Sequence, residues 1–327
     1  MNIHEKGKPV KARLRAAAAA ALLISLADIS GGALFTAKGA EPIYIEPLFE
    51  YPVAPEELPD LQSKTDYLME HFWDAMDFSK DTPVDQNALN DAFGVYAQSM
   101  PYASKDAVMK SITTLLKRYH GNSTLTLQFA KAAEEALYGN RAYFWSDEVY
   151  LPFLKEIVGN KKIPELRKAR YAAQLELVKR NSIGAKFPRL RITCRDGRQK
   201  DYRPECEYTI VEFGNPGCED CRFSKTKLSM ASDLQELVEE GKLEILFLVA
   251  DAVPEEQEEI LRQFAGYPAS WQTAISYGAD DIFDIRRTPS FFVLGKDGKI
   301  IAKNLDVTDA VECVRGLIKP KTYGTEK

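Results

Sequence analysis

Two cysteines at the expected start of a helix constrain this chain more than any other feature. Cys218 and Cys221 follow the apolar run Tyr208–Phe213, and a helical pattern extends from Arg222 to about Glu240. A buried strand, a short turn and a helix in this order place both sulfurs at the helix N-terminus. Unpaired backbone N–H groups and a partial positive charge at that end favour a thiolate, the nucleophile of thiol-disulfide exchange. The two-residue spacer leaves the second sulfur close enough to resolve a mixed disulfide, so the pattern predicts a redox-active pair.

The same spacing occurs in half of a zinc site, which is the metal alternative. A structural zinc site usually needs four Cys or His ligands. The remaining cysteines contain no second pair of this spacing, and the histidines lie far away in the sequence: Cys194, Cys206 and Cys313; His4, His71 and His120. We therefore expect no metal, and no motif implies an organic cofactor.

A proline at the expected start of a strand is the second informative feature. Thr288 and Pro289 precede the apolar run 291–294, and a turn at 295–298 leads into a further apolar run at 299–302. This arrangement predicts a hairpin. Proline is tolerated at the first residue of a strand, and a peptide bond before proline can be cis. An ordinary trans proline at the strand start is the alternative.

Together these segments resemble the thioredoxin fold, and within it the TlpA/ResA-like extracytoplasmic thiol-disulfide oxidoreductases. The resemblance covers about residues 184–319 and implies a three-layer α/β/α domain with a mixed sheet. It implies that Cys218 attacks a substrate disulfide and that Cys221 resolves the mixed disulfide. It also implies that Pro289 is a cis-proline beside the pair, that Thr288 touches Cys218, and that Gly217 borders the bound substrate.

Glu212 lies in the otherwise apolar strand before the cysteine pair. Alternation along the strand places its side chain on the face opposite Val211 and Phe213, which fixes the face and not the burial. The resemblance implies a buried acid that carries protons to and from Cys221. A buried carboxyl group would have a raised pKa and could exchange protons near neutral pH. A glutamate at a strand edge, directed at water, is the alternative.

The residues around the pair depart from the family pattern. Gly217 stands where many relatives carry Trp, and Asp220 stands where Pro is common. The negative charge of Glu219 and Asp220 opposes the thiolate and makes the disulfide less oxidising. We therefore expect a reductant or isomerase rather than a strong oxidant. A peroxiredoxin is disfavoured because Asn215 occupies the place of the threonine that this family needs.

The predicted activity implies two kinds of partner. Protein or small thiol and disulfide substrates would exchange with the pair, and a membrane or periplasmic electron donor would reduce it again. The net charge of −5 gives no reason to expect nucleic acid. The competing interpretation is an envelope binding or assembly protein, in which the thioredoxin-like domain is a scaffold and Cys218–Cys221 a static disulfide.

Residues 1–40 predict export. A basic start, the uncharged apolar run Ala16–Leu26 and small residues between Ala33 and Ala40 form the pattern of a secretory signal peptide. The run is shorter than the roughly 20 residues of a membrane-spanning helix, so an uncleaved anchor is the second interpretation. We expect a periplasmic or cell-envelope protein whose residues 41–60 form an extended lead-in.

Residues 61–183 show helical periodicity throughout. Apolar residues recur at three- and four-residue spacing in about six segments, which predicts an all-α domain of packed amphipathic helices. The segment Tyr67–Asp74, with Asp77 and Phe78, resembles an uncharacterised helical domain that precedes thioredoxin-like domains in exported Bacteroides-type proteins. His71 and Trp73 either line a groove or pack a helix interface.

The second domain, residues 184–320, alternates strands and helices, so the whole chain is predicted to be α+α/β. Besides the hairpin, strands are expected at 189–194, 199–203, 208–213 and 243–250, and helices at 221–240, 254–264, 280–285 and 308–318. Cys194 and Cys206 either form a structural disulfide or remain a free pair that accepts electrons from the active site. Cys313 is left over and is expected to be a buried, inert thiol.

Overall fold

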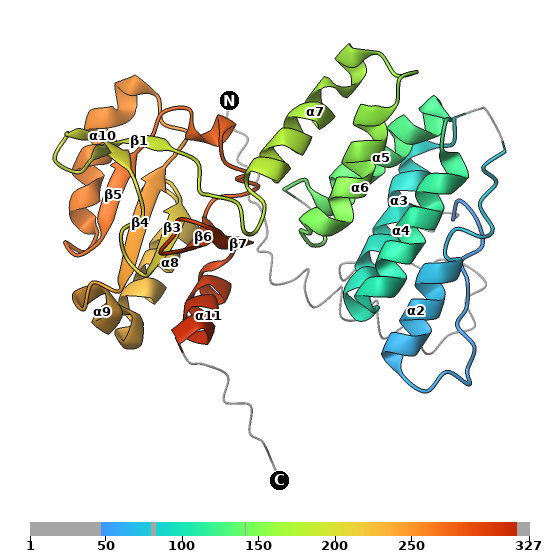
Figure 1. Ribbon diagram of the computed structural model, residues 1–327, viewed down its shortest axis with the longest axis horizontal. Helices are drawn as coiled ribbons and strands as arrows, with labels where there is room; N and C mark the ends of the chain where they lie inside the picture. Colours follow the sequence, from blue (N-terminus) through green and yellow to red (C-terminus); the bar gives the residue numbers. More distant parts are fainter. Residues whose placement is uncertain (1–46, 80–82, 141, 319–327) are drawn as a thin grey trace, which may run out of the picture. The chain divides into compact units, whose positions relative to one another are not determined.

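The computed structural model describes residues 47–79, 83–140 and 142–318 (Figure 1). The predicted signal peptide lies outside the described residues, as do residues 41–46 of the lead-in. The chain divides between Tyr171 and Ala172 into two compact units, and the division falls inside one helix, α7 (Glu165–Arg180). Within the described ranges, no helix combines the length and the apolar character that a membrane crossing requires.

Six helices follow one another from residue 61 to residue 180, in agreement with the predicted helical segments. Before α7 these are α2 (Leu61–His71), α3 (Gln86–Ser99), α4 (Lys105–Tyr119), α5 (Ser123–Leu137) and α6 (Asp147–Gly159). Each of these five begins after a side chain that accepts a hydrogen bond from a backbone N–H of the first turn: Asp60, Asp85, Ser104, Asn122 and Ser146. These side chains accept hydrogen bonds from backbone N–H groups that otherwise have no partner at the start of a helix.

Aromatic rings fill the core of the first unit. Trp73 is only 3% exposed, and its ring lies 5.2 Å from that of Phe129 and 5.3 Å from that of Tyr96. From the lead-in, Phe49 packs edge to face on Phe72 at 5.8 Å. Trp73 therefore packs a helix interface, as in the second of the two predicted roles.

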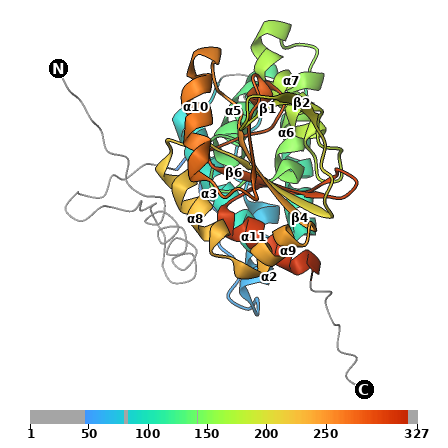
Figure 2. The same cartoon turned by 90° about the vertical axis from the view of Figure 1, so that its left-hand side faces the viewer.

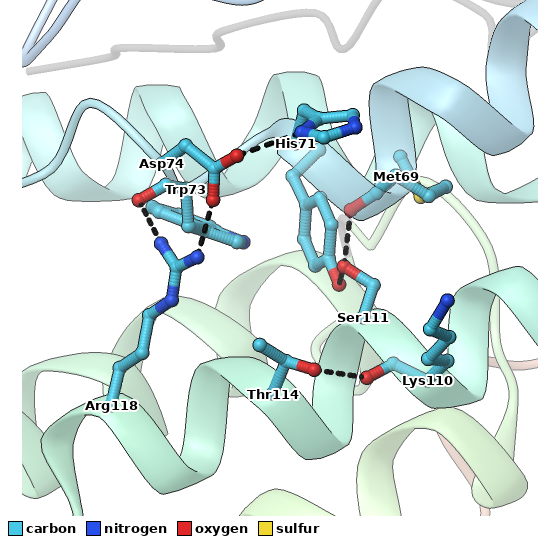
Figure 3. Close-up of polar contacts among 9 residues, drawn as sticks. Met69, His71, Trp73, Asp74, Lys110, Ser111, Thr114 and Arg118 are labelled. Atoms are coloured by element: carbon cyan, nitrogen blue, oxygen red, sulfur yellow. Dashed lines mark hydrogen bonds and ion pairs between the residues drawn. The ribbon is translucent and has the colours of Figure 1, made fainter.

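The turn after α2 is held by α4 (Figure 3). Arg118 donates to the carbonyl oxygen of Trp73 at 2.6 Å and forms an ion pair with the carboxylate of Asp74. The other carboxylate oxygen of Asp74 lies 2.8 Å from Nδ1 of His71, whose ring packs on Tyr67 at 4.3 Å. His71 thus takes part in a network at the surface of the helical unit.

The second unit is built on one mixed seven-stranded sheet, with the order β2-β1-β5-β4-β3-β6-β7. Its strands are β1 (Leu190–Cys194), β2 (Gln199–Tyr202), β3 (Tyr208–Phe213), β4 (Leu243–Val249), β5 (Gln272–Ile275), β6 (Ser290–Gly295) and β7 (Ile300–Leu305). The central strand β3 runs parallel to β4 and antiparallel to β6. The prediction of a helical part followed by a thioredoxin-like mixed-sheet domain is confirmed.

The two faces of the sheet bury different residues. One face packs beneath α8 (Glu219–Ser229), α9 (Ser232–Glu239), α10 (Gln257–Gln263) and α11 (Val307–Ile318). Figure 2 shows α8 and α11 side by side on this face. The other face buries Val211, Phe213, Phe283 and Phe292. Residues of β3 alternate between the two cores, so Val211 and Phe213 face away from the helices that follow the cysteine pair.

Three elements differ from the prediction. The single helix expected over 221–240 is two helices, separated by Met230 and Ala231. The expected helix at 280–285 is only the short 3₁₀ turn Ala279–Asp281. The strand β5 has no counterpart in the prediction, since four residues are too few for an alternation signal and pairing with β4 and β1 creates the strand.

Candidate functional site

The cysteine pair lies at the end of the central strand of the sheet. After β3, the N–H of Gly214 donates to the carbonyl oxygen of Leu248 in β4 at 3.1 Å, which continues the pairing by one residue. The side chain of Asn215 then closes the turn by accepting from the N–H of Gly217 at 2.9 Å. The chain enters α8 with Cys218 as its N-cap. The predicted order of strand, turn and helix is confirmed.

The two sulfurs have different surroundings. Sγ of Cys218 accepts a hydrogen bond from the backbone N–H of Cys221 at 3.3 Å, and the Cys218 side chain is half-buried. Cys221 is completely buried. Burial, together with the hydrogen bond to Cys218, raises the pKa of the Cys221 thiol well above its ordinary value. Cys218 is thus the sulfur that a second molecule can reach, and Cys221 is kept protonated.

Gly214 allows Cys221 to lie close against the strand. A Cβ atom at this position would lie 2.6 Å from the ring of Phe247 and 3.2 Å from Sγ of Cys221. Contacts under 3.0 Å with a packed ring cannot be accommodated without a shift of the surroundings. Glycine is therefore the residue that fits between β4 and the buried sulfur.

Glu212 is buried in the same core as Cys221. The side chain has no solvent exposure, and neither carboxylate oxygen has a hydrogen-bond partner among the described residues. Burial raises the pKa of Glu212 to about 8, and the positive charge of Lys225 partly offsets that rise. The predicted face is confirmed, and the alternative of a strand-edge glutamate directed at water is wrong.

Pro289 lies at the same end of the sheet as the pair. The Thr288–Pro289 peptide bond is cis, as the resemblance implies. Ser290, which follows at once, is the first residue of β6 and pairs with Phe213, the last residue of β3. The antiparallel pairing of β3 with β6 therefore brings Pro289 to the end from which the chain turns towards Cys218. The contact between Thr288 and Cys218 stays a prediction.

Lys225 and Tyr267 also belong to this region, although the sequence did not single them out. Nζ of Lys225 donates to the carbonyl oxygen of Gly266 at 3.0 Å and lies 4.9 Å from the centre of the Tyr267 ring. Lys225 had a usable signal, because residues four apart share a helix face and Lys225 follows Cys221 by four. Tyr267 had none, since it comes from a loop that only the folded sheet brings near.

A buried group of charges precedes Thr288. Asp284 accepts from Arg286 at 2.8 Å and from Lys303 of β7 at 2.5 Å, and all three charged side chains are almost completely buried. Burial alone would raise the pKa of Asp284, but the two cations lower it below its ordinary value. This ion group ties the segment before the cis-proline to the edge of the sheet.

The remaining cysteines lie elsewhere. All five cysteines are free thiols in this structure, so the pairing of Cys194 with Cys206 stays a prediction. Cys194 borders an open pocket of about 670 Å³ between the β1–β2 hairpin and residues 269–273, and none of residues 214–221 lines it. Cys313 is half-buried on α11, and burial raises its pKa. Within the described ranges, no group of three or more His, Cys, Asp and Glu side chains is placed to hold a metal ion.

Comparisons with known proteins give a family match for the first part of the chain and a fold match for most of it. Residues 26–181 match the domain of unknown function DUF5106. The chain is similar in fold to the crystal structure of a thioredoxin-like protein from Bacteroides caccae, with a TM-score of 0.68 and 21% identity over 83% of this chain and 99% of that one.

Shorter matches cover 42% of this chain. One is to 99% of the thioredoxin domain of a thiol-disulfide oxidoreductase from Bacteroides vulgatus (19% identity, TM-score 0.35). Another is to 96% of a putative thiol:disulfide interchange protein DsbE from Chlorobium tepidum (15% identity, TM-score 0.35). No curated protein matches the chain. The chain is therefore similar in fold to a thioredoxin-like protein, and its residues 26–181 match the domain of unknown function DUF5106.

Proposed function

We propose that this protein is an exported thiol-disulfide oxidoreductase that works through Cys218 and Cys221 as a reductant or isomerase. The unequal burial of the two sulfurs at one helix start carries this proposal. An accessible sulfur beside a buried, protonated one is what sequential exchange requires, because only the first has to meet the substrate. A purely structural disulfide needs no such difference.

Exchange would proceed in two steps. The Cys218 thiolate attacks one sulfur of a substrate disulfide, which forms a mixed disulfide and releases the other substrate sulfur as a thiolate. Cys221 then gives its proton to the Glu212 carboxylate, and its thiolate attacks Sγ of Cys218. The second substrate sulfur leaves as a thiolate, and both substrate thiolates take up protons. The substrate gains two electrons, the pair loses two, and an external dithiol donor must return them.

Glu212 suits the role of proton carrier. Its carboxyl group faces the same core as Cys221 and contributes to the raised pKa of that thiol. Because the pKa of Glu212 is about 8, the group can gain and lose a proton near neutral pH. In the proposed mechanism, Thr288 and Pro289 hold the substrate backbone, and the exposed Gly217 leaves room for it.

The charges near the pair favour the reducing direction. Glu219 and Asp220 stand in the first turn of α8, where they oppose a thiolate on Cys218. A less stabilised thiolate makes the disulfide a weaker oxidant. Export rests on the signal-peptide pattern of residues 1–40, and the expected partners are disulfide-containing substrates and a membrane or periplasmic electron donor.

The reduction potential of the Cys218–Cys221 pair tests the proposal. Purified protein is equilibrated in redox buffers, and free thiols are then trapped and counted by mass. We expect a reversible transition nearer to about −270 mV, the thioredoxin value, than to about −120 mV, the DsbA value. A pair that remains oxidised well below about −300 mV would be a static disulfide. That result would favour a binding or assembly protein with a thioredoxin-like scaffold.

A further inference from the structure

The buried carboxyl group of Glu212 needs a counter-charge if it is to ionise during exchange. A carboxylate without hydrogen bonds in an apolar core is costly, and the cost falls when a cation lies near. Neighbouring strands supply none, because Glu212 pairs with Phe247 in β4 and with Phe291 in β6. The cation must therefore come from a covering element.

Lys225 is the cation whose charge acts on Glu212. It lies on α8, one turn beyond Cys221, and its side chain is half-buried. Two contacts fix the ammonium group: the hydrogen bond to the Gly266 carbonyl oxygen at 3.0 Å and the face of the Tyr267 ring at 4.9 Å. Neither contact is with a carboxylate, so both hold the group in place without cancelling its charge.

Tyr267 connects this cation to the core around Glu212. Its ring is only 6% exposed and packs on the ring of Phe247 at 4.5 Å. Phe247 is the β4 partner of Glu212, so Lys225, Tyr267 and Phe247 form one contiguous stack against the strand of the carboxyl group. The segment 264–267 thereby determines where the ammonium group lies.

We propose that Lys225 is a positioning residue for Glu212: held by the Gly266 carbonyl and the Tyr267 ring, it supplies the charge that lets the buried carboxylate exist beside Cys221. This inference rests on the proposed function only for its link to exchange. The ionisation of Glu212 itself is independent of any substrate. The titratable groups of this core are Glu212 in β3, Cys218 at the N-cap of α8, Cys221 and Lys225 within α8, and Tyr267 from the segment after α10.

The decisive measurement is the titration of Glu212 in the purified protein, followed by carbon NMR with ¹³C-labelled glutamate side chains. Glu212→Gln identifies the signal. Working with the oxidised Cys218–Cys221 pair removes both thiols and their coupled titrations. In Lys225→Met we expect the midpoint to rise by about one pH unit, since an uncompensated buried carboxylate holds its proton more tightly. A midpoint unchanged in Lys225→Met would overturn the inference.

Two control variants separate this effect from general damage to α8. Lys227→Met removes a lysine from the same helix that bonds to Thr308, and we expect it to leave the Glu212 midpoint unchanged. Lys225→Arg keeps the charge and can stack on an aromatic ring, so its Glu212 midpoint should stay close to that of the wild type. A midpoint that rises equally in Lys227→Met would contradict a specific role for Lys225.

Tyr267 provides a second test of the positioning. Tyr267→Leu keeps an apolar cover but removes the aromatic face, so Lys225 loses one of its two anchors. We expect the Glu212 midpoint to rise in this variant by less than in Lys225→Met, and we expect the double variant to match Lys225→Met, because both changes act on one charge. Fully additive shifts would overturn this part of the inference.

Exchange assays then separate the inference from the proposed function. If the wild-type protein reduces a small aromatic disulfide, the acid limb of its pH profile should move to higher pH with the Glu212 midpoint in Lys225→Met, because exchange requires the ionised carboxylate. If the wild type shows no exchange while the midpoint still shifts, the proposed function fails and the role of Lys225 in the ionisation of Glu212 stands.

Discussion

Sγ of Cys218 accepts a hydrogen bond from the backbone N–H of Cys221, so one side chain both caps α8 and carries the accessible sulfur. The N–H donor that stabilises the helix start is thus available to a thiolate on Cys218. Because the bond requires only an acceptor at this position, the capping role and the chemical role can be separated by substitution.

Cys218→Ser is expected to abolish exchange and to leave the fold intact. Serine is a favourable N-cap, so we expect the free energy of unfolding to change by less than about 1 kcal/mol. Reduction of a small aromatic disulfide, followed by absorbance, measures the activity, and chemical denaturation measures the stability. Cys313→Ser, which changes a half-buried cysteine on α11, should retain full activity. Exchange that persists in Cys218→Ser would contradict the role of Cys218 as the attacking cysteine.

Glu212 is expected to make the stability of the reduced protein depend on pH. Its pKa is about 8 in the folded protein, compared with the ordinary value of 4.5 that applies to the unfolded chain. Below pH 4.5 both states are protonated. Between pH 4.5 and 8 the unfolded chain ionises first, so this group's contribution to stability is lost as the pH rises.

Glu212→Gln should remove that loss. We expect the variant to match the wild type near pH 4 and to exceed it by roughly 3–5 kcal/mol at pH 8. Denaturation with urea at a series of pH values measures the difference. Glu239→Gln, an exposed position at the end of α9, is the matched control and should show no such trend. A constant difference across the pH range would mean that Glu212 has the same pKa in the folded and unfolded states, so that burial does not raise it.

Gly214→Ala should destabilise the protein and disturb Cys221. The added methyl group would meet the ring of Phe247 and the sulfur of Cys221, and overpacking of this kind typically costs about 1–3 kcal/mol. At Gly217 the nearest atom to an added Cβ is Oδ1 of Asn215 at 3.4 Å, an ordinary contact. Gly217→Ala should therefore stay within about 0.5 kcal/mol of the wild type in thermal unfolding. Equal losses of stability in Gly214→Ala and Gly217→Ala would contradict the close approach of Gly214 to Phe247 and Cys221.

Asp284→Asn should lower the free energy of unfolding far more than the same substitution of a surface aspartate does. The substitution leaves the buried cations of Arg286 and Lys303 without their shared negative charge, a loss typically worth about 3–5 kcal/mol. Asp233→Asn removes an exposed ion pair with Arg315 and should cost less than about 1 kcal/mol. Chemical denaturation of both variants gives the comparison, and similar costs would rule out the energetic importance of the buried group.

The sequence predicted the parts of the site that depend on local pattern. The pair Cys218–Cys221, the face of Glu212 and the hairpin after Pro289 follow from spacing and alternation, which the backbone dictates within a few residues. The burial of Glu212 did not follow, because burial depends on which elements cover a strand. The spacing of Lys225 four residues after Cys221 could have predicted that both lie on one helix face, whereas no pattern in the sequence pointed to Tyr267.

The fold shows the same division between local and distant causes. Six helices of the first part were predicted because each buries one stripe of its own side chains. The strand β5 was missed because its four residues become a strand only between β4 and β1. The break between α8 and α9 was missed because both helices bury apolar residues in the same core, as one continuous helix would.

The position of β3 between β4 and β6 has a consequence for the newly made chain. The two cysteines are close in sequence, but the residues of the core that buries Cys221 come from strands and loops far along the chain, such as Phe264 and Phe291. Such non-local pairings form late in folding, because their long loops must close first. Until then the two sulfurs are equally open to any oxidant. Folding is therefore the step that makes the two cysteines different, because it buries Cys221 and leaves Cys218 accessible.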